Sequence, residues 1–588
     1  MKRIFFSFLF LVGVIANSFA FPGNGVIYMR PATDGGYDSN SGATWDEAKE
    51  TFLAALNAAK GTAAKNYTDA KDVYIQGGTY IFTAPISFNA QAYSGIHIYG
   101  GFTGYDDNET PETRAQKTDA KPWEFENPTI FDGNNCSTDI IRTSKPSDAK
   151  IIFDGIGFEN AGTSGATNQP ALALRDGMYF NKCSFKNNKS GGNGGAVLIY
   201  DGLKADKTPI GVVFTQCYFY NNCGGNGKQG GALYGNLYPG DMLKVIDCVF
   251  EKNVHPGPGA AICTFPGTIN NKVIVDGCQF IENESTNGDG GAVYLGQCRL
   301  LNSTFYGNKV SNGKQGAAAF IGRAGDVIAN CVIYNNDANK GSVVAIANAG
   351  SMINCTLTNN RSGNAVNCYL ESGVVVNSAI IGNKQLDNTE SGVYSKSPIL
   401  VSNCASSATL NDAYQLVSNK EVNDVSVFVN PTDFVGIAVN QTQQNQLKSC
   451  DWSPKSGSDL IANGDVTSFS LSLSDVYSSI PSTPDYLGNA RFSNNGTTIN
   501  IGAIENGEKI SVDTKPIGVQ KIRVYATDNK ITVQNMVETA KVSVYDMQGK
   551  LIHSSVSTGS FSLNVPANIY IVKVVSATVS NTYKVSAF

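Results

Sequence analysis

The sequence predicts an all-β protein, in which a parallel β-helix solenoid with an N-terminal capping helix precedes a small C-terminal antiparallel β-sandwich. Two observations predict the solenoid. A six-residue motif, Cys/Ser-x-Phe/Ile/Leu-x-x-Asn, recurs eight times between Cys183 and Asn383, at intervals of 23 to 34 residues. A second element, Gly-Gly-Ala-aliphatic or a close variant, follows most copies. Repeats of this length with variable spacing are typical of solenoids whose turns carry loops of different size.

Each repeat contains a short strand that begins at the Cys or Ser. Because strand side chains alternate between two faces, the first and third residues of the motif share one face, which we expect to point inward. Successive turns then stack in parallel about 4.8 Å apart, and identical residues form ladders. The first position of this structural ladder is occupied by Cys183, Cys217, Cys248, Cys278, Cys331 and Cys355, with Ser303 and Ser378 in the other two turns.

The last residue of the motif is Asn in all eight copies: Asn188, Asn222, Asn253, Asn283, Asn308, Asn336, Asn360 and Asn383. We expect it to lie in a bend with a left-handed backbone, which Asn tolerates better than other non-glycine residues. The 13 cysteines are an odd number. Ladder neighbours about 4.8 Å apart also exceed the ~3.8 Å between the Cβ atoms of a relaxed disulfide. We therefore interpret the ladder cysteines as small buried core residues; a redox or metal role is the alternative.

The alternation of Phe-x-x-Asn with Gly-Gly-Ala-aliphatic resembles the repeat of the polymorphic outer-membrane proteins and, more broadly, the right-handed, pectin-lyase-like β-helix proteins. The resemblance covers about two hundred residues and implies a right-handed solenoid. It does not imply one function, because one fold hosts many activities.

The first residues carry signals for export and for a cap. Residues 1–20 are typical of a secretory signal peptide, with Lys2 and Arg3 before an apolar run and small residues before position 21. No stretch reaches the length of a transmembrane helix. In the expected cap, 21–100, a capping box at 44–47 predicts a helix. Its apolar face comprises Trp45, Ala48, Phe52, Ala55, Leu56 and Ala59. This segment resembles the N-terminal part of bacterial extracellular β-helix proteins.

Beyond the regular repeats, about 150–400, we expect a closing segment at 401–507, so that the β-helix spans 21–507. A linker at 508–520 follows. Residues 521–588 contain alternating strands separated by turns, which predicts the sandwich. The order Val-Tyr-Asp-x-x-Gly-Lys, Tyr-Ile-Val-Lys-Val and a final Lys-Val resembles the C-terminal sorting domain of the type IX secretion system of Bacteroidetes. The resemblance implies the secretion machinery as a partner, and a protein that is secreted or anchored at the outer surface after passing the periplasm. An ordinary accessory sandwich is the alternative.

Composition narrows the function classes. The net charge of -5 argues against a nucleic-acid partner. The three histidines lie far apart in sequence and give little support for a His-based zinc site or a serine or cysteine triad. We expect no cofactor. Residues 287–291 are similar to half a calcium-binding turn, but this turn stands alone, so calcium is only a minor alternative.

Many extracellular β-helices cleave acidic polysaccharides, which requires clustered carboxylates and a basic residue. The candidates for a lyase or hydrolase are Asp247, Asp276, Arg299 and Arg323. Other turns have Asn where Asp247 stands, which favours a role of Asp247 in the bend. Lys228 and Lys314 lie in identical Gly-rich loops, and we expect them to be solvated loop tips.

Aromatic residues offer a second kind of site. Tyr234, Tyr294 and Phe320 stand four positions after the first Gly of the Gly-Ala element, and Tyr220, Tyr306 and Tyr334 follow the motif Phe or Ile directly. By alternation we expect the second set to be exposed. Such residues form either a stripe on which sugars stack or ordinary packing. The preferred interpretation is a secreted or cell-surface protein without catalytic activity, adhesin-like or carbohydrate-binding; the alternative is a divergent polysaccharide lyase or glycoside hydrolase.

Overall fold

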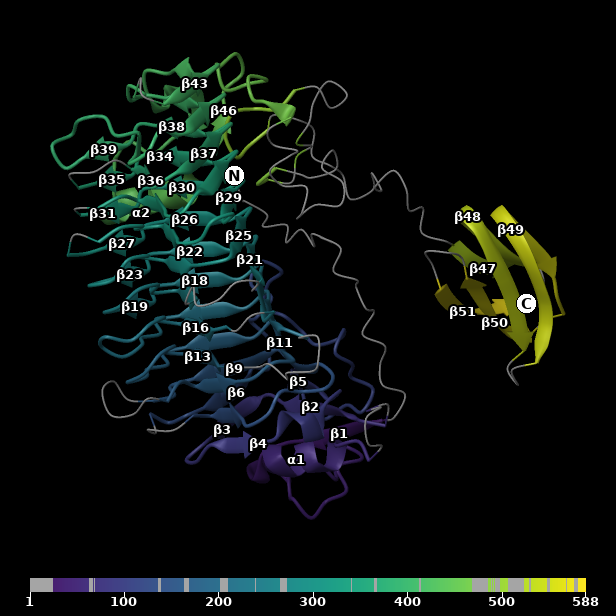
Figure 1. Ribbon diagram of the computed structural model, residues 1–588. Coiled ribbons are helices and arrows are strands. Elements are labelled where there is room, and N and C mark those ends of the chain that lie inside the picture. Colours follow the sequence, from purple (N-terminus) through teal and green to yellow (C-terminus); the bar gives the residue numbers. More distant parts are fainter. Residues whose placement is uncertain are drawn as a thin grey trace. The chain divides into compact units, whose positions relative to one another are not determined.

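The computed structural model (Figure 1) describes residues 25–62, 67, 69–135, 139–162, 169–200, 210–237, 240–264, 272–312, 314–339, 341–363, 367–411, 414–467, 485–487, 489, 491, 498–505, 523–527, 530–546, 550–566, 568–575 and 580–587. The predicted signal peptide and linker lie outside these residues. The chain divides into two compact units, Met1–Glu508 and Lys509–Phe588. No helix among the described residues is long and apolar enough to cross a membrane.

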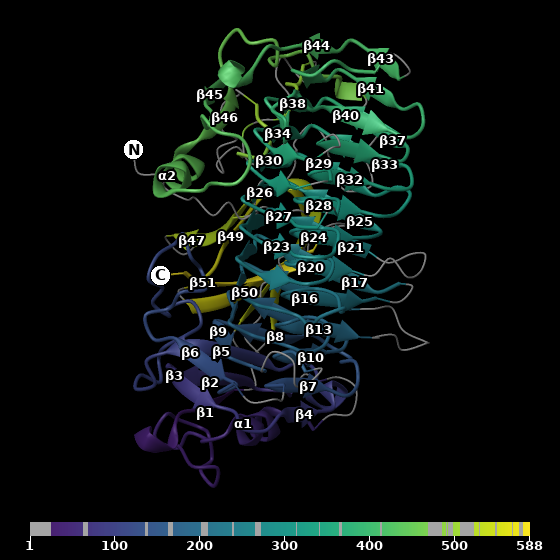
Figure 2. The same ribbon diagram turned by 90° about the vertical axis from the view of Figure 1, so that its left-hand side faces the viewer.

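The first unit is a parallel β-solenoid of about eleven turns (Figures 1 and 2). Most turns contribute one strand to each of three sheets, which we name A, B and C, and neighbouring strands of these sheets pair in parallel from one turn to the next. The predicted parallel β-helix is therefore confirmed, and its right hand stays a prediction.

Sheet A consists of β1 (Val26–Met29), β2 (Asp72–Gln76), β5 (His97–Phe102), β8 (Ile151–Asp154), β11 (Met178–Asn181), β14 (Val212–Thr215), β17 (Met242–Ile246), β21 (Lys272–Asp276), β25 (Cys298–Leu301), β29 (Val327–Ala329), β33 (Gly350–Ile353), β37 (Gly373–Val376), β41 (Leu400–Ser402) and β43 (Gln415–Val417). Sheet B consists of β3 (Gly78–Ile81), β6 (Thr129–Asp132), β9 (Ile156–Glu159), β12 (Ser184–Lys186), β15 (Tyr218–Tyr220), β18 (Val249–Glu251), β22 (Gln279–Ile281), β26 (Thr304–Tyr306), β30 (Val332–Tyr334), β34 (Thr356–Thr358), β38 (Ala379–Ile381), β42 (Ala405–Ser406) and β44 (Lys420–Glu421).

Sheet C consists of β4 (Ile86–Phe88), β7 (Ile141–Thr143), β10 (Leu172–Leu174), β13 (Val197–Tyr200), β16 (Leu233–Asn236), β20 (Ile262–Thr264), β24 (Val293–Leu295), β28 (Ala319–Ile321), β32 (Val344–Ile346), β36 (Cys368–Leu370) and β40 (Val393–Ser395). A short fourth sheet, D, follows sheet B in the later turns and consists of β19 (Val254–His255), β23 (Glu284–Ser285), β27 (Lys309–Val310), β31 (Asp337–Ala338), β35 (Arg361–Ser362) and β39 (Lys384–Gln385).

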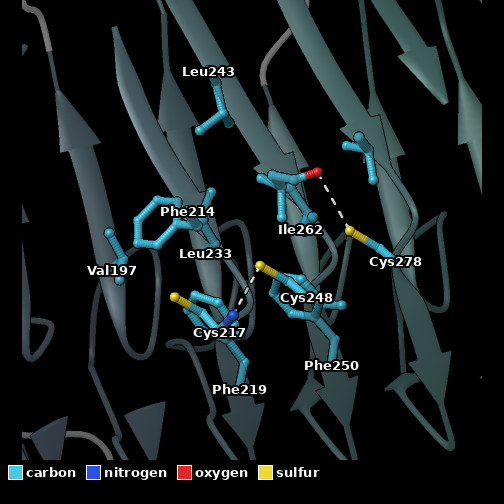
Figure 3. Close-up of a cluster of buried hydrophobic side chains, with 14 of the residues drawn as sticks. Val197, Phe214, Cys217, Phe219, Leu233, Leu243, Cys248, Phe250, Ile262 and Cys278 are labelled. Carbon is cyan, nitrogen blue, oxygen red and sulfur yellow. Dashed lines mark hydrogen bonds between the residues drawn. The ribbon is translucent and has the colours of Figure 1, made fainter. Parts of the chain in front are cut away.

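The interior of the solenoid is filled by columns of identical side chains. The Phe position of the motif forms one column, Phe185, Phe219, Phe250, Phe280 and Phe305, whose neighbouring ring centroids are 4.4 to 5.2 Å apart. Figure 3 shows Phe219 and Phe250 beside Cys217, Cys248 and Cys278 in this interior. The described cysteines are free thiols, and the ladder cysteines are buried. The backbone N–H of Cys217 donates to Cys248 Sγ at 3.3 Å, so these sulfurs also accept hydrogen bonds from the chain.

The ladder Asn residues do not have the left-handed backbone that we expected of them. Their side chains are buried and form a hydrogen-bonded column: Asn222 Nδ2 donates to Asn253 Oδ1 at 2.9 Å and to the Phe185 carbonyl at 3.0 Å. The left-handed residue is the one before: Asn187, Asn221, Lys252, Glu282, Gly307, Asn335, Asn359 and Gly382. The side-chain amide of each ladder Asn thus forms hydrogen bonds with backbone groups inside the corner, and the residue before it adopts the left-handed conformation of the turn.

The N-terminal cap differs from the prediction in where its helix begins. Helix α1 spans Phe52–Ala59 and is capped by Thr51, whose side chain accepts a hydrogen bond from the N–H of Ala54. Residues 44–47 form a turn instead. Trp45 packs 4.7 Å from Tyr28, and both Trp45 and Ala48 belong to a separate cluster on the outer face of sheet A, so neither belongs to the helix face. The buried face of α1 closes the core at the first turns. The short helix η1 (Ala32–Asp34) lies between β1 and α1, and η2 (Ala90–Tyr93) lies between β4 and β5.

After β44 the chain returns along the outer faces of sheets A and B (Figure 2). This closing segment contains η3 (Val425–Val427), β45 (Phe428–Asn430), α2 (Gln441–Ser449) and β46 (Asp451–Pro454). Left-handed Asn residues at the corners bind it: Asn335 Nδ2 donates to the Phe434 carbonyl at 2.9 Å, and Asn354 Nδ2 to the Gly502 carbonyl at 3.2 Å.

The second unit is antiparallel, as predicted. Its strands are β47 (Arg523–Thr527), β48 (Lys530–Asp546), β49 (Leu551–Asn564), β50 (Asn568–Val575) and β51 (Ser580–Ala587), and they form one hydrogen-bonded sheet. The pairing of the long strand β48 shifts register near Gln534 and Met536. One half of β48 pairs with β47 and the other with β50, around a core that includes Ile531, Val544 and Val572.

Candidate carbohydrate-binding faces

The six predicted aromatic residues lie on two different faces. Tyr234, Tyr294 and Phe320 occupy one outward row of sheet C, in which Cys263 stands between the first two. The row continues through Ala345 to Tyr369 and Tyr394. Sequence reasoning missed these last two because their turns lack the Gly-Ala element from which the position was counted. A tyrosine one residue after the start of each expected sheet C strand is the signal that would have found them.

The aromatic residues of sheet C form two stacked pairs. The rings of Tyr294 and Phe320 are 4.8 Å apart and nearly parallel, and those of Tyr369 and Tyr394 are 6.0 Å apart. Tyr234 is buried, whereas Tyr394 is 47% exposed. Tyr394 lies on β40, and among the described residues no further strand of sheet C covers the ring face that points away from Tyr369. Lys396 and Glu371 form an ion pair of 3.2 Å beside this pair of rings.

On sheet B the prediction of exposure is wrong for Tyr334, which is buried. Tyr220 and Tyr306 are half-buried rather than exposed. Tyr334 is 6% exposed because the closing segment covers it: its hydroxyl donates to the Leu447 carbonyl at 3.2 Å, and its ring lies 5.4 Å from Trp452. Tyr306 stacks on Tyr334 at 5.1 Å and is half-buried at the edge of the same segment. These two tyrosines therefore hold the closing segment in place.

A different aromatic group stands on sheet B at β15, the fifth strand of this sheet. Trp123, from the long segment between β5 and β6, stacks on Tyr218 with ring centroids 5.0 Å apart, and Tyr218 lies 5.8 Å from Tyr220. All three are half-buried. Sequence reasoning could not find this group, because nothing in the segment around Trp123 shows which turn it packs against.

The four residues of the catalytic alternative lie at two corners. Asp247 and Asp276 lie at the corner between sheets A and B, where Asn302 Nδ2 donates to Asp276 Oδ1 at 2.8 Å. Arg299 Nη1 instead donates to the Gly325 carbonyl at 2.7 Å, and the backbone N–H of Arg323 donates to Asp326 at 2.8 Å. The two arginines thus make these contacts at the corner where the chain enters sheet A.

The other polar candidates have structural contacts or lie at the surface. Lys228 and Lys314 are exposed. Asp289 Oδ1 accepts a hydrogen bond of 2.9 Å from the backbone N–H of Gln315. Among the residues that the structure describes, no group of three or more His, Cys, Asp or Glu side chains is arranged to hold a metal ion.

Asp247 has a left-handed backbone, like Asn302, Asn330, Asn354 and Asn377 at the same corner. Burial, and then the charge of Asp276, raise the pKa of Asp247 to about 7. The folded protein therefore holds a proton that the unfolded chain, with an Asp pKa of ~3.9, releases, and Asp247 makes stability fall as pH rises from about 4 to about 7.

We expect Asp247→Asn to stabilise the protein at pH 8 by roughly 1–2 kcal/mol, after a discount for solvent access. It should have little effect at pH 4. Urea denaturation at both pH values measures this difference. Asp119→Asn, at an exposed carboxylate, is the control. An equal effect of Asp247→Asn at both pH values would contradict the assignment.

The chain matches no protein-family model, and it matches no curated protein. Among solved structures it is similar to the crystal structure of tailspike protein 3 of bacteriophage CBA120, with 12% sequence identity and a TM-score of 0.26. The match covers 68% of this chain and 62% of the tailspike chain, so this chain spans less than two thirds of the tailspike. The parallel solenoid is therefore established by the strand pairing of the chain itself, and function is inferred from the residues on the outer faces of sheets B and C.

Proposed function

We propose that this protein is a secreted or outer-surface glycan-binding protein, adhesin-like and without catalytic activity, whose right-handed β-helix presents the aromatic row of sheet C to polysaccharide. The observation that carries the proposal is the set of four aromatic rings between Tyr294 and Tyr394 in one register, interrupted by Ala345, which ends on the exposed ring of Tyr394.

Two physical features support sugar binding at this row. Aromatic rings offer flat apolar surface to the C–H faces of sugars, and fixed polar groups beside them set orientation. Tyr394 supplies the open ring, while Lys396 and Glu371 supply hydrogen-bonding groups next to it. A rigid parallel sheet fixes the spacing of these groups, so little conformational entropy is lost on binding.

Tyr394→Ala is expected to weaken binding of the responsive glycan about tenfold, since one stacking contact of this kind is worth roughly 1–1.5 kcal/mol. A glycan array with the full chain identifies the responsive glycan, and calorimetry then measures its affinity. Tyr105→Ala, at a tyrosine that is 73% exposed on another segment, is the matched control. Equal loss in both variants, or no binding to any glycan, would contradict the proposal.

The export route is part of the same proposal and is supported by the sequence of residues 521–588. We expect deletion of these residues to retain the solenoid in the periplasm of a host with a type IX secretion system. Cell fractionation measures the distribution. An unchanged surface fraction after the deletion would argue that this unit is an accessory domain.

A further inference from the structure

A part of sheet B stays open between two covered parts. The outward side chains of β15, β18 and β22 are half-buried, and we name them the sheet B window: Tyr218, Tyr220, Val249, Glu251, Gln279 and Ile281. At one end, Trp123 packs on Tyr218. At the other end Thr304 is hydrogen-bonded to Tyr486, and Gln444 of α2 donates to Glu282 Oε1 at 2.7 Å.

The window and the next strand, β26, together have the length of a short oligosaccharide. Tyr220, Glu251, Ile281 and Tyr306 stand in one register on four successive strands. At ~4.8 Å per strand, the two tyrosines lie about 14 Å apart along the solenoid. A bound chain would thus lie along the axis of the solenoid from Tyr220 across Glu251 and Ile281 toward Tyr306, which stands at the edge of the closing segment.

The charged groups in and beside the window indicate the class of sugar. Lys252 Nζ lies 3.5 Å from Glu251 Oε1 and 3.7 Å from Glu282 Oε2, so one ammonium group serves two carboxylates. Tyr218 also donates to Glu251 Oε2 at 2.9 Å. The nearby charges Lys186 and Glu159 form their own pair at 3.1 Å. One negative charge remains in excess, which disfavours a uronic-acid polymer and favours a cation.

Lys252 marks where a cationic group of a ligand fits. Its side chain is 49% exposed and its ion pairs are long, so they contribute little stability. An ammonium group of a ligand that also stacks on the tyrosines can therefore replace the lysine at small cost. We propose that the sheet B window is a second binding site, distinct from the sheet C row, for oligosaccharides of amino sugars with free ammonium groups, held between Glu251 and Glu282 and stacked on Tyr220.

The test uses the full chain and two probes of equal length, a glucosamine tetrasaccharide and its N-acetylated counterpart, in calorimetry at low salt. The glucosamine probe should bind more tightly. Lys252→Asn removes the competing ammonium but keeps a residue that suits the left-handed corner, as in Asn221 and Asn335. We expect it to strengthen glucosamine binding by about two- to fivefold. Glu251→Gln with Glu282→Gln should weaken glucosamine binding by about tenfold and leave the N-acetylated probe unchanged.

Two controls keep this site separate from the sheet C row. Lys314→Asn removes an exposed lysine from a distant loop and should not change the affinity for either probe. Tyr394→Ala should leave glucosamine binding intact. Equal affinity for the two probes, no binding of either, weaker binding in Lys252→Asn, or loss of binding in Tyr394→Ala would each overturn the proposal. The melting temperature of every variant shows that loss of binding is not loss of fold.

Discussion

Replacing Phe219 by Ala is expected to lower the free energy of unfolding of the solenoid by about 3–5 kcal/mol. The Phe219 side chain is fully buried, and its ring centroid lies 4.5 Å from that of Phe185 and 4.4 Å from that of Phe250. Strand pairing fixes the spacing of these neighbours, so they cannot move together to fill the cavity. Urea denaturation followed by circular dichroism measures the change.

Phe219→Leu separates volume from aromatic stacking, because Leu357 occupies the same ladder position in another turn. We expect this variant to lose only about 1–2 kcal/mol. Tyr105→Ala, at the surface, should change stability by less than about 0.5 kcal/mol. If Phe219→Ala costs no more than Tyr105→Ala, the Phe column does not stabilise the solenoid.

The inward residues could be predicted from the sequence because their position follows from periodicity alone. Once Cys183 and Phe185 are placed on one strand face, the equivalent residues of every later turn follow. The role of the ladder Asn was harder to predict. Asn suits both a left-handed corner and a buried amide column. In two turns the left-handed position is occupied by Lys252 and Glu282, so the residue type does not mark the corner there.

The candidate faces depended on contacts that no repeat encodes. Tyr334 follows the same motif as Tyr220, yet Leu447 and Trp452 of the closing segment cover only Tyr334. Trp123 likewise reaches Tyr218 from a segment outside the repeats. Alternation predicts which side chains point out of the core. Whether such a side chain is exposed to solvent or covered depends on segments that lie far away in sequence.

Asn253→Asp is expected to destabilise the protein by about 3–5 kcal/mol at neutral pH, since it buries a charge that lacks a cationic partner. Asn253 Nδ2 donates to the Phe219 carbonyl at 3.1 Å and to Asn283 Oδ1 at 2.9 Å. A carboxylate would instead place a negative charge against these two acceptors. Asn221→Asp makes the same change at an exposed corner and is the matched control, with an expected effect below about 0.5 kcal/mol.

The pH dependence identifies the buried charge as the cause. A carboxyl group at position 253 would have a folded-state pKa above the ~3.9 of the unfolded chain, because burial and the facing acceptors disfavour its charged form. The folded state then binds the proton more tightly, so the loss relative to the natural protein is largest above the raised pKa and becomes smaller as pH falls toward 4. Urea denaturation of both proteins at pH 4.5 and 7.5 measures this difference. A loss that is the same at both pH values would mean that the missing hydrogen bonds, and not the charge, destabilise the column.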